Sequence, residues 1–146
     1  MGIRSAKGTI VKLGNGASPE IFSTIGQMRS MSGPTTTATV QDVTTHSTAG
    51  NWTEKLATLI DPGTMSFPIN YDSADATHQF ATGLWQLMIN LTQKNFQVVF
   101  PANIGYMELA AYLTSHAFDC PVDNVLQANI ELTIYGAISA ANGALP

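Results

Sequence analysis

Charged residues are scarce in this chain of 146 residues, at 11% of the sequence against about 25% in a typical soluble domain. A surface with so few charges has little electrostatic repulsion to keep neighbouring copies apart. The scarcity therefore favours a protein whose surface is partly covered by partners. A soluble surface rich in Thr, Ser and Asn fits the composition equally well.

Lys and Arg are missing altogether from residues 95–146, where four acidic residues lie, whereas residues 1–94 hold six residues of each sign. Stable binding of nucleic acid requires clustered cations that neutralise phosphates. The composition argues against such binding. It is compatible with a surface along which DNA passes without being held.

Cysteine occurs only at position 120, so an intramolecular disulfide is impossible. The histidines, His46, His78 and His116, are too far apart for a common metal-binding motif. The sequence also lacks a nucleophile elbow, a Walker motif and a dinucleotide-binding fingerprint. We therefore predict no catalytic, metal or cofactor site, and no enzyme. The longest apolar stretch, near residues 84–91, is too short to span a bilayer, so no membrane insertion is expected.

Alternation of apolar and polar residues predicts several strands. The clearest is 126–135, in which one face carries Ala128, Ile130, Leu132 and Ile134. Gly136 is expected to end this strand and to leave a short tail at 138–146. Residues 64–71 also alternate, and Pro68 places them at a sheet edge because proline donates no ladder hydrogen bond. Further strands are predicted at 8–14, 20–30, 96–100 and 106–118, the last with a helix as competitor.

A single apolar stripe with helical spacing lies within residues 76–91, and it consists of Phe80, Leu84, Leu87, Met88 and Leu91. Asp75 is suited to cap the N-terminus of this helix. His78 would then lie on the solvated first turn. A stripe of this kind is more often core packing than a partner-binding face.

Residues 40–63 are the least regular part of the chain, with scattered apolar residues among many Thr, Ser, Asn and Gly. The spacing of Trp52, Leu56 and Leu59 fits a short helix at about 52–59. Loops of this length are uncommon in compact domains and are often functional. Two interpretations stay open: an excursion that covers the domain's own core, or an arm that reaches a neighbouring subunit.

Short turn and strand signatures follow one another along most of the chain. They are SMSGP at 30–34, QDVTTHS at 41–47, DPGTMSFPINY at 61–71, FP at 100–101, PVD at 121–123 and IELTIYG at 130–136. In this order and at these separations, over roughly residues 8–137, the chain resembles the major tail tube proteins of long, non-contractile-tailed (siphovirus, lambda-like) bacteriophages. The signatures are structural rather than catalytic, so the resemblance points to assembly.

The resemblance implies a mainly β fold, with β-sandwich or barrel-like sheets flanked by one α-helix at about 76–91 and a long loop at about 40–63. It implies a single tail tube domain over residues 1–146, with its core at about 8–137. In that family six subunits form a ring, and the rings stack into a hollow tube through which DNA is ejected. The chain would then be a structural protein of the virion tail, assembled in the host cytoplasm.

The resemblance also implies partners, but no cofactor. The first partner is the chain itself, in hexameric rings stacked into a helical tube. Further partners are the tape measure protein, the tail terminator and the distal tail proteins. Double-stranded DNA would pass through the lumen without stable binding.

The family's long loop bridges subunits, so the resemblance implies inter-subunit contacts at Thr45, His46, Trp52, Leu56, Leu59 and Asp61. Strands of neighbouring subunits would join into a barrel around the lumen. The polar face of 126–135 is the candidate lining, because neutral and acidic side chains let phosphates slide. Its residues are Gln127, Asn129, Glu131 and Thr133.

Two alternatives accompany this interpretation. Another ring-forming phage or secretion-system tube protein, such as a tail terminator, a baseplate hub piece or an Hcp-like tube, would share the architecture and differ in how far its rings stack. A small soluble enzyme or ligand-binding β domain is disfavoured, because the sequence shows no convergent cluster of titratable residues.

Overall fold

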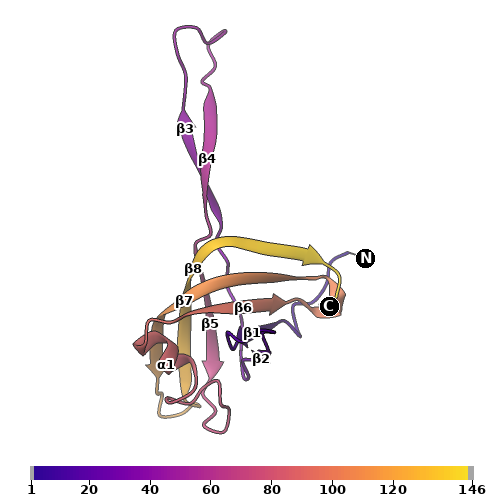
Figure 1. The fold of residues 1–146 in the computed structure, drawn as a ribbon, viewed down its shortest axis with the longest axis vertical. Coiled ribbons are helices and arrows are strands. Elements are labelled where there is room, and N and C mark those ends of the chain that lie inside the picture. Colours follow the sequence, from indigo (N-terminus) through magenta and orange to yellow (C-terminus); the bar gives the residue numbers. More distant parts are fainter. Residues whose placement is uncertain (1, 145–146) are drawn as a thin grey trace.

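The computed structural model describes residues 2–144 as a β-rich body from which a two-stranded arm projects (Figure 1). Ten elements follow one another along these described residues. They are β1 (Ile10–Gly14), β2 (Phe22–Thr24), β3 (Thr37–Asp42), β4 (Lys55–Asp61), β5 (Thr64–Asn70), α1 (Leu84–Ile89), β6 (Gln93–Val99), the 3-10 helix η1 (Pro101–Asn103), β7 (Gly105–Asp119) and β8 (Gln127–Asn142).

The body is built on one antiparallel sheet with the strand order β2-β1-β6-β7-β8-β5. The segment that follows β2 connects the two ends of this sheet. The Ile25 amide donates to the Val11 carbonyl of β1 at 2.9 Å, and Ser32 exchanges two backbone hydrogen bonds with Ser66 of β5, at 2.8 and 2.9 Å. The sheet is thereby bent round into a barrel-like body, as the resemblance implies.

The inward faces of the strands meet in one hydrophobic core. The predicted alternation on β8 is confirmed, because its core side chains are 0–6% exposed; they are Ala128, Ile130, Leu132 and Ile134. On β5 the core residues are Met65, Phe67 and Ile69. The strand β5 lies at the end of the sheet order, as Pro68 predicts.

Residues 106–118 form a strand, and the helix that competed for this segment is absent. Irregular pairing between Leu113 and Ser115 makes Thr114 an extra residue in β7. Such a bulge shifts the alternation by one position. Consequently Leu113 faces the core before the bulge and His116 faces it afterwards.

The prediction that Gly136 ends the last strand is wrong, because β8 continues to Asn142. Glu108 pairs with Ser139 and Ala110 pairs with Tyr135, so the residues around Gly136 bulge out of the ladder. Gly136 has a φ of 75°, which glycine adopts at no steric cost. The glycine therefore bends the strand instead of ending it, and most of the predicted tail at 138–146 belongs to β8.

The predicted helix at 76–91 is also wrong in extent, because only Leu84–Ile89 is α-helical. The Asp72 and Asp75 carboxylates accept hydrogen bonds from backbone amides two residues further on, each at 2.9 Å. These local turns compete with helix formation. Gly83 then adopts an extended conformation, so α1 starts there, and Asp75 is not its N-cap. None of the helices among the described residues has the length and apolar character needed to cross a membrane.

The shortened helix divides the predicted apolar stripe. Leu84 is buried in the core, and Leu87 and Met88 pack against it. Phe80 and Leu91, which a longer helix would align with them, are 53% and 78% exposed. The stripe is thus core packing only where α1 forms.

Candidate assembly surfaces

The arm, defined here as residues 37–61, is a β-hairpin. β3 and β4 pair from Thr37 opposite Asp61 at the base to Asp42 opposite Lys55 near the tip. The helix predicted at 52–59 is therefore wrong. Pairing with β3 satisfies the backbone of β4, and Thr and Val in the facing strand favour extended structure.

Hydrogen bonds at the tip fix how the hairpin turns. The Val43 amide donates to the Glu54 carbonyl at 2.9 Å, and the Glu54 amide donates to the Thr44 hydroxyl at 2.7 Å. The Asp42 carboxylate accepts from the Thr44 amide at 2.9 Å. Hydrogen bonds from the Thr44 side chain and amide hold the pKa of Asp42 below its ordinary value of 3.8. The arm is thus built by its own contacts.

All residues of β3 and β4 are exposed. Large apolar side chains of the arm share this exposure, at 42–82%; they are Val40, Val43, Trp52, Leu56, Leu59 and Ile60. A ribbon that projects from the body has no core of its own, so water covers these side chains in a single copy (Figure 1). Large apolar side chains that stay exposed together on one projecting segment are typical of surfaces that other molecules cover.

All six predicted contact residues lie on the arm, but they do not form one cluster. Thr45, His46 and Trp52 lie toward the tip, Leu56 and Leu59 lie on β4, and Asp61 lies at the base. The Asp61 carboxylate accepts from the Gly63 amide at 2.9 Å, so it also shapes the connecting turn. Sequence analysis missed Val40, Val43 and Ile60, although the two-residue alternation around Val40 could have revealed β3.

Close backbone contacts attach the arm to the body. The Thr35 amide donates to the Thr64 carbonyl at 3.1 Å, and the Ile134 amide of β8 donates to the Gly63 carbonyl at 3.0 Å. Gly63 has a φ of 76°, and a side chain there would collide with the Thr35 carbonyl. The arm therefore leaves the barrel in a direction that the chain itself fixes.

The outer part of β8 leaves a sheet edge open. β5 pairs with β8 only as far as Thr133, whereas the stretch from Tyr135 to Asn142 pairs with β7 alone among the described residues. A groove of about 830 Å³ lies between this stretch and the base of the arm, and Ile60, Pro62, Met107 and Ile138 are among its lining residues. An open edge of this kind is suited to accept a strand from another chain.

The polar face of β8 lies outside the barrel. Asn129, Glu131 and Thr133 are exposed, and the Thr133 hydroxyl lies 3.1 Å from the hydroxyl of Thr114. Gln127 differs from the prediction, because it is only 8% exposed. It lies where β8 begins, between Asn70 and Asp119 of the flanking strands. The structure therefore offers three of the four predicted lining residues to solvent.

The histidines differ in their surroundings. His78, predicted to be solvated, is buried: its Nδ1 accepts from the Asp72 amide at 2.9 Å and its Nε2 lies 2.8 Å from the Gly26 carbonyl. His116 is buried among aromatic rings, and this burial lowers its pKa. His46 is exposed on the arm. Within residues 2–144 no group of three or more His, Cys, Asp and Glu is arranged to hold a metal ion.

Comparison with known proteins identifies one family. A family model described as "Lambda phage tail tube protein, TTP" matches residues 5–141. No curated protein matches the sequence. The family match covers the barrel, the arm and nearly all of β8.

Solved structures share the fold at low sequence identity. The tail of an empty gene transfer agent particle, refined with C6 symmetry, has a TM-score of 0.72 and 21% identity, over 94% of this chain and 98% of that chain. The SPP1 tail tube has a TM-score of 0.69 and 11% identity, over 94% of this chain and 78% of that chain. The sheath/tube terminator of an extracellular contractile injection system has a TM-score of 0.73 and 12% identity, over 97% of this chain and 98% of that chain. The predicted mainly β, tail-tube-like fold is confirmed.

Proposed function

Since this chain belongs to the family of lambda phage tail tube proteins, we propose that its copies form hexameric rings that stack into the hollow tube of a phage tail. The chain is a structural component of the virion tail. The observation that carries the proposal is the family match over residues 5–141, on a fold whose arm exposes apolar side chains that a single copy leaves uncovered.

Self-assembly has support from two features of the fold. The arm projects beyond the body, so its apolar residues can reach another copy (Figure 1). The open edge of β8 can pair with a strand of a neighbour. A contact between two different surfaces of the same chain closes into a ring when its rotation allows, and otherwise propagates. We assign inter-subunit contacts to Thr45, His46, Trp52, Leu56, Leu59 and Asp61 on this basis.

The same proposal names the other molecules that the tube would contact. The tube would enclose the tape measure protein, end at the tail terminator and begin on the distal tail proteins. Double-stranded DNA would pass through the lumen. Asn129, Glu131 and Thr133 are suited to line it, because a neutral to acidic surface does not hold phosphates.

A second candidate function has a specific observation in its favour. The sheath/tube terminator of the contractile injection system shares the fold as closely as the tail tubes do. A terminator would stop at a single ring, whereas a tube protein would continue to stack. The family match favours the tube.

Negative-stain electron microscopy of the purified protein at high concentration, paired with light scattering, tests the proposal. Hollow tubes of stacked rings are the expected result. Single rings that never stack would favour the terminator. A monomer that stayed monomeric after addition of a tail initiator complex would contradict both functions.

A further inference from the structure

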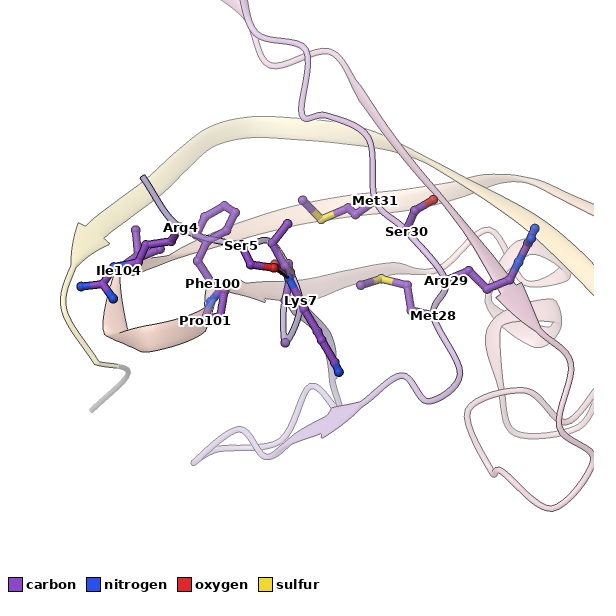
Figure 2. Close-up of a pocket in the computed structure, with 13 residues that line it drawn as sticks. Arg4, Ser5, Lys7, Met28, Arg29, Ser30, Met31, Phe100, Pro101 and Ile104 are labelled. Carbon is purple, nitrogen blue, oxygen red and sulfur yellow. Dashed lines mark hydrogen bonds between the residues drawn. The ribbon is translucent and has the colours of Figure 1, made fainter. Parts of the chain in front are cut away.

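A cleft of about 650 Å³ lies beside the N-terminal segment, at the end of the barrel where β6 passes into η1 (Figure 2). Three of the six Lys and Arg residues of the chain line this basic cleft: Arg4, Lys7 and Arg29. None of its lining residues is acidic. Half of the Lys and Arg residues of this charge-poor chain therefore line one cleft, and Figure 2 shows their charged ends spread along it, from Arg4 beside Ile104 at one end to Arg29 at the other.

The floor of the basic cleft is apolar. Met28, Met31 and Phe100 line it and pack against the hydrophobic core, and Ile104, 46% exposed, adds to its wall. A cleft with cations at the rim and apolar side chains on the floor fits a segment that carries both carboxylates and aliphatic groups.

Within residues 2–144, no carboxylate pairs with a cation of the cleft. The one contact within 4 Å between a basic side chain and a carboxylate in this range joins His78 to Asp75, at 3.9 Å, and it includes no Lys or Arg. Arg4, Lys7 and Arg29 are all exposed. Their charges are thus available to another molecule.

The connection between β7 and β8, residues 119–126, has the complementary character. This acidic turn carries Asp119 and Asp123, and no hydrogen bond or ion pair within the described residues engages their carboxylates. Val122 between them is fully exposed, and Val125 is 52% exposed. Carboxylates and aliphatic side chains therefore stand together on one exposed turn.

The basic cleft and the acidic turn lie at opposite ends of β7. Ile104 of the cleft directly precedes this strand, and Asp119 of the turn is its last residue. In Figure 1 the strand runs from beside the chain termini to the far end of the barrel. The two surfaces of one copy consequently cannot meet each other.

We propose that the basic cleft receives the acidic turn of a second copy of this chain. Asp119 and Asp123 approach Arg4, Lys7 and Arg29, while Val122 and Val125 cover the apolar floor. The contact joins two different surfaces, so it runs head to tail, as a closed ring or a stacked tube requires. This inference rests on the proposed function, because it names a contact by which the tube is held together.

Nucleic acid is a weaker candidate for the cleft. Phosphate binding would leave the apolar floor facing a charged backbone, and the rest of the chain supplies few further cations to follow a duplex. The acidic turn matches both the charge and the apolar floor. A second copy is therefore the occupant that the chemistry favours.

Charge reversal on each side provides the test. The cleft variant carries Lys7→Glu and Arg29→Glu, and the turn variant carries Asp119→Lys and Asp123→Lys. All four residues are exposed, so both variants are expected to fold, as circular dichroism and thermal melting will verify. A control variant with Lys12→Glu and Lys94→Glu makes the same change in net charge as the cleft variant, outside the cleft.

Each reversal places like charges against each other when a variant meets its own copies. We expect the concentration at which tubes form to rise about tenfold or more for either variant alone, and to stay near the wild-type value for the control. An equimolar mixture of the two variants restores opposite charges at each contact. The mixture should therefore assemble close to the wild-type concentration, with the variants alternating.

The outcomes separate this inference from the proposed function. Normal tubes from either variant alone, or folded variants whose mixture does not assemble, would overturn the inference while wild-type tubes upheld the function. If wild-type protein formed no tubes, sedimentation of the two variants would still test the contact. Association in the mixture but not in either variant alone would support the contact, and a mixture that does not associate would refute it. Normal tubes together with lost retention of double-stranded DNA by the cleft variant would instead assign the cleft to phosphates.

Discussion

The barrel and the arm use the same kinds of residue in opposite surroundings. On β8 of the barrel, Leu132 is fully buried, whereas Leu59 on β4 of the arm is 73% exposed. Both strands have their backbones paired with an antiparallel neighbour. The difference lies in whether a second layer of side chains covers the strand.

This difference indicates which part of the chain serves which purpose. Burial of the barrel's apolar residues stabilises the fold of one copy, since apolar area removed from water contributes about 25 cal/mol per Å². The arm gains nothing of this kind until another molecule covers it. We infer that the barrel determines folding, whereas the apolar side chains of the arm serve assembly alone.

Removal of the arm should give the largest effect. Replacing residues 38–60 by a four-residue Gly-Ser turn connects Thr37 to Asp61, which already face each other. We expect a folded barrel with nearly unchanged melting temperature and a complete loss of tubes, measured by circular dichroism and electron microscopy. Normal tubes from this variant would remove the arm from assembly, and an unfolded barrel would contradict the independence of the two regions.

A matched pair of leucine substitutions comes next. Leu132→Ala leaves a cavity in the core and should lower the free energy of unfolding of the monomer by about 2–5 kcal/mol. Leu59→Ala on the arm should change it by no more than about 0.5 kcal/mol. Urea titrations under conditions that prevent assembly measure both values. Similar losses for the two variants would mean that the arm packs against its own barrel.

The two tryptophans of the chain sharpen the comparison further. Trp52 of the arm is 82% exposed, whereas Trp85 of α1 packs at 5.4 Å, centroid to centroid, against the His116 ring. Loss of an aromatic anchor at an interface costs about 2 kcal/mol or more, so Trp52→Ala should raise the concentration for tube formation roughly thirtyfold. Trp85→Ala should lower thermal stability instead. A loss of thermal stability from Trp52→Ala and a loss of tube formation from Trp85→Ala would contradict the division between arm and barrel.

The prediction of the fold from sequence succeeded where one face of a strand is buried. The alternation on β5 and β8 gave the correct core residues, because burial on a single face leaves a two-residue period. The helix at 76–91 was overestimated because periodicity does not register competing side-chain turns at Asp72 and Asp75. The continuation of β8 was missed because a glycine with positive φ has the same appearance in a sequence whether it ends a strand or bends it.

The candidate surfaces were predictable only in part. The arm was located correctly as a segment, but its strands were missed, because the alternation around Val40 is short and β4 carries mixed residues on both of its exposed faces. The burial of Gln127 depends on neighbours from β5 and β7, which a local pattern does not contain. The basic cleft combines Arg4 and Arg29 with Ile104, so only the folded chain brings it together.

Acidification should lower the melting temperature through a histidine of the barrel but not through one of the arm, and we expect this effect to be smaller than those above. Burial lowers the pKa of His116 from its ordinary value of 6.5, so the unfolded chain binds a proton that the folded barrel resists. Stability is therefore full above about pH 6.5 and falls as the pH drops below that value. Melting temperatures between pH 7.5 and 5 should show this decline in the wild type and less of it in His116→Phe.

The control for this experiment is His46→Phe, because His46 lies exposed on the arm. It should retain the wild-type dependence on pH. Burial opposes the lowered pKa of Asp75, but hydrogen bonds from Thr77 keep it below its ordinary value of 3.8. The stability that Asp75 contributes is therefore lost only below that pH, outside the range of this experiment. Parallel pH profiles for the wild type and His116→Phe would rule out His116 as the source.

The smallest effect is expected on the outer face of β8. Glu131→Lys adds a cation to a surface that we propose lines the lumen, so folding and tube formation should stay close to the wild type. Phage carrying the variant should eject DNA more slowly, because the cation attracts phosphates. Thr133→Lys should act in the same way. Loss of assembly with either variant would place this face in a packed interface instead.

Hydrogen–deuterium exchange of the monomer and of assembled tubes tests the division between barrel and arm most directly. Backbone amides of the arm, residues 37–61, should exchange rapidly in the monomer and slowly in the tube, while those of the buried part of β8 should be protected equally in both. Arm amides that exchange at the same rate in monomer and tube would contradict the claim that assembly covers the arm.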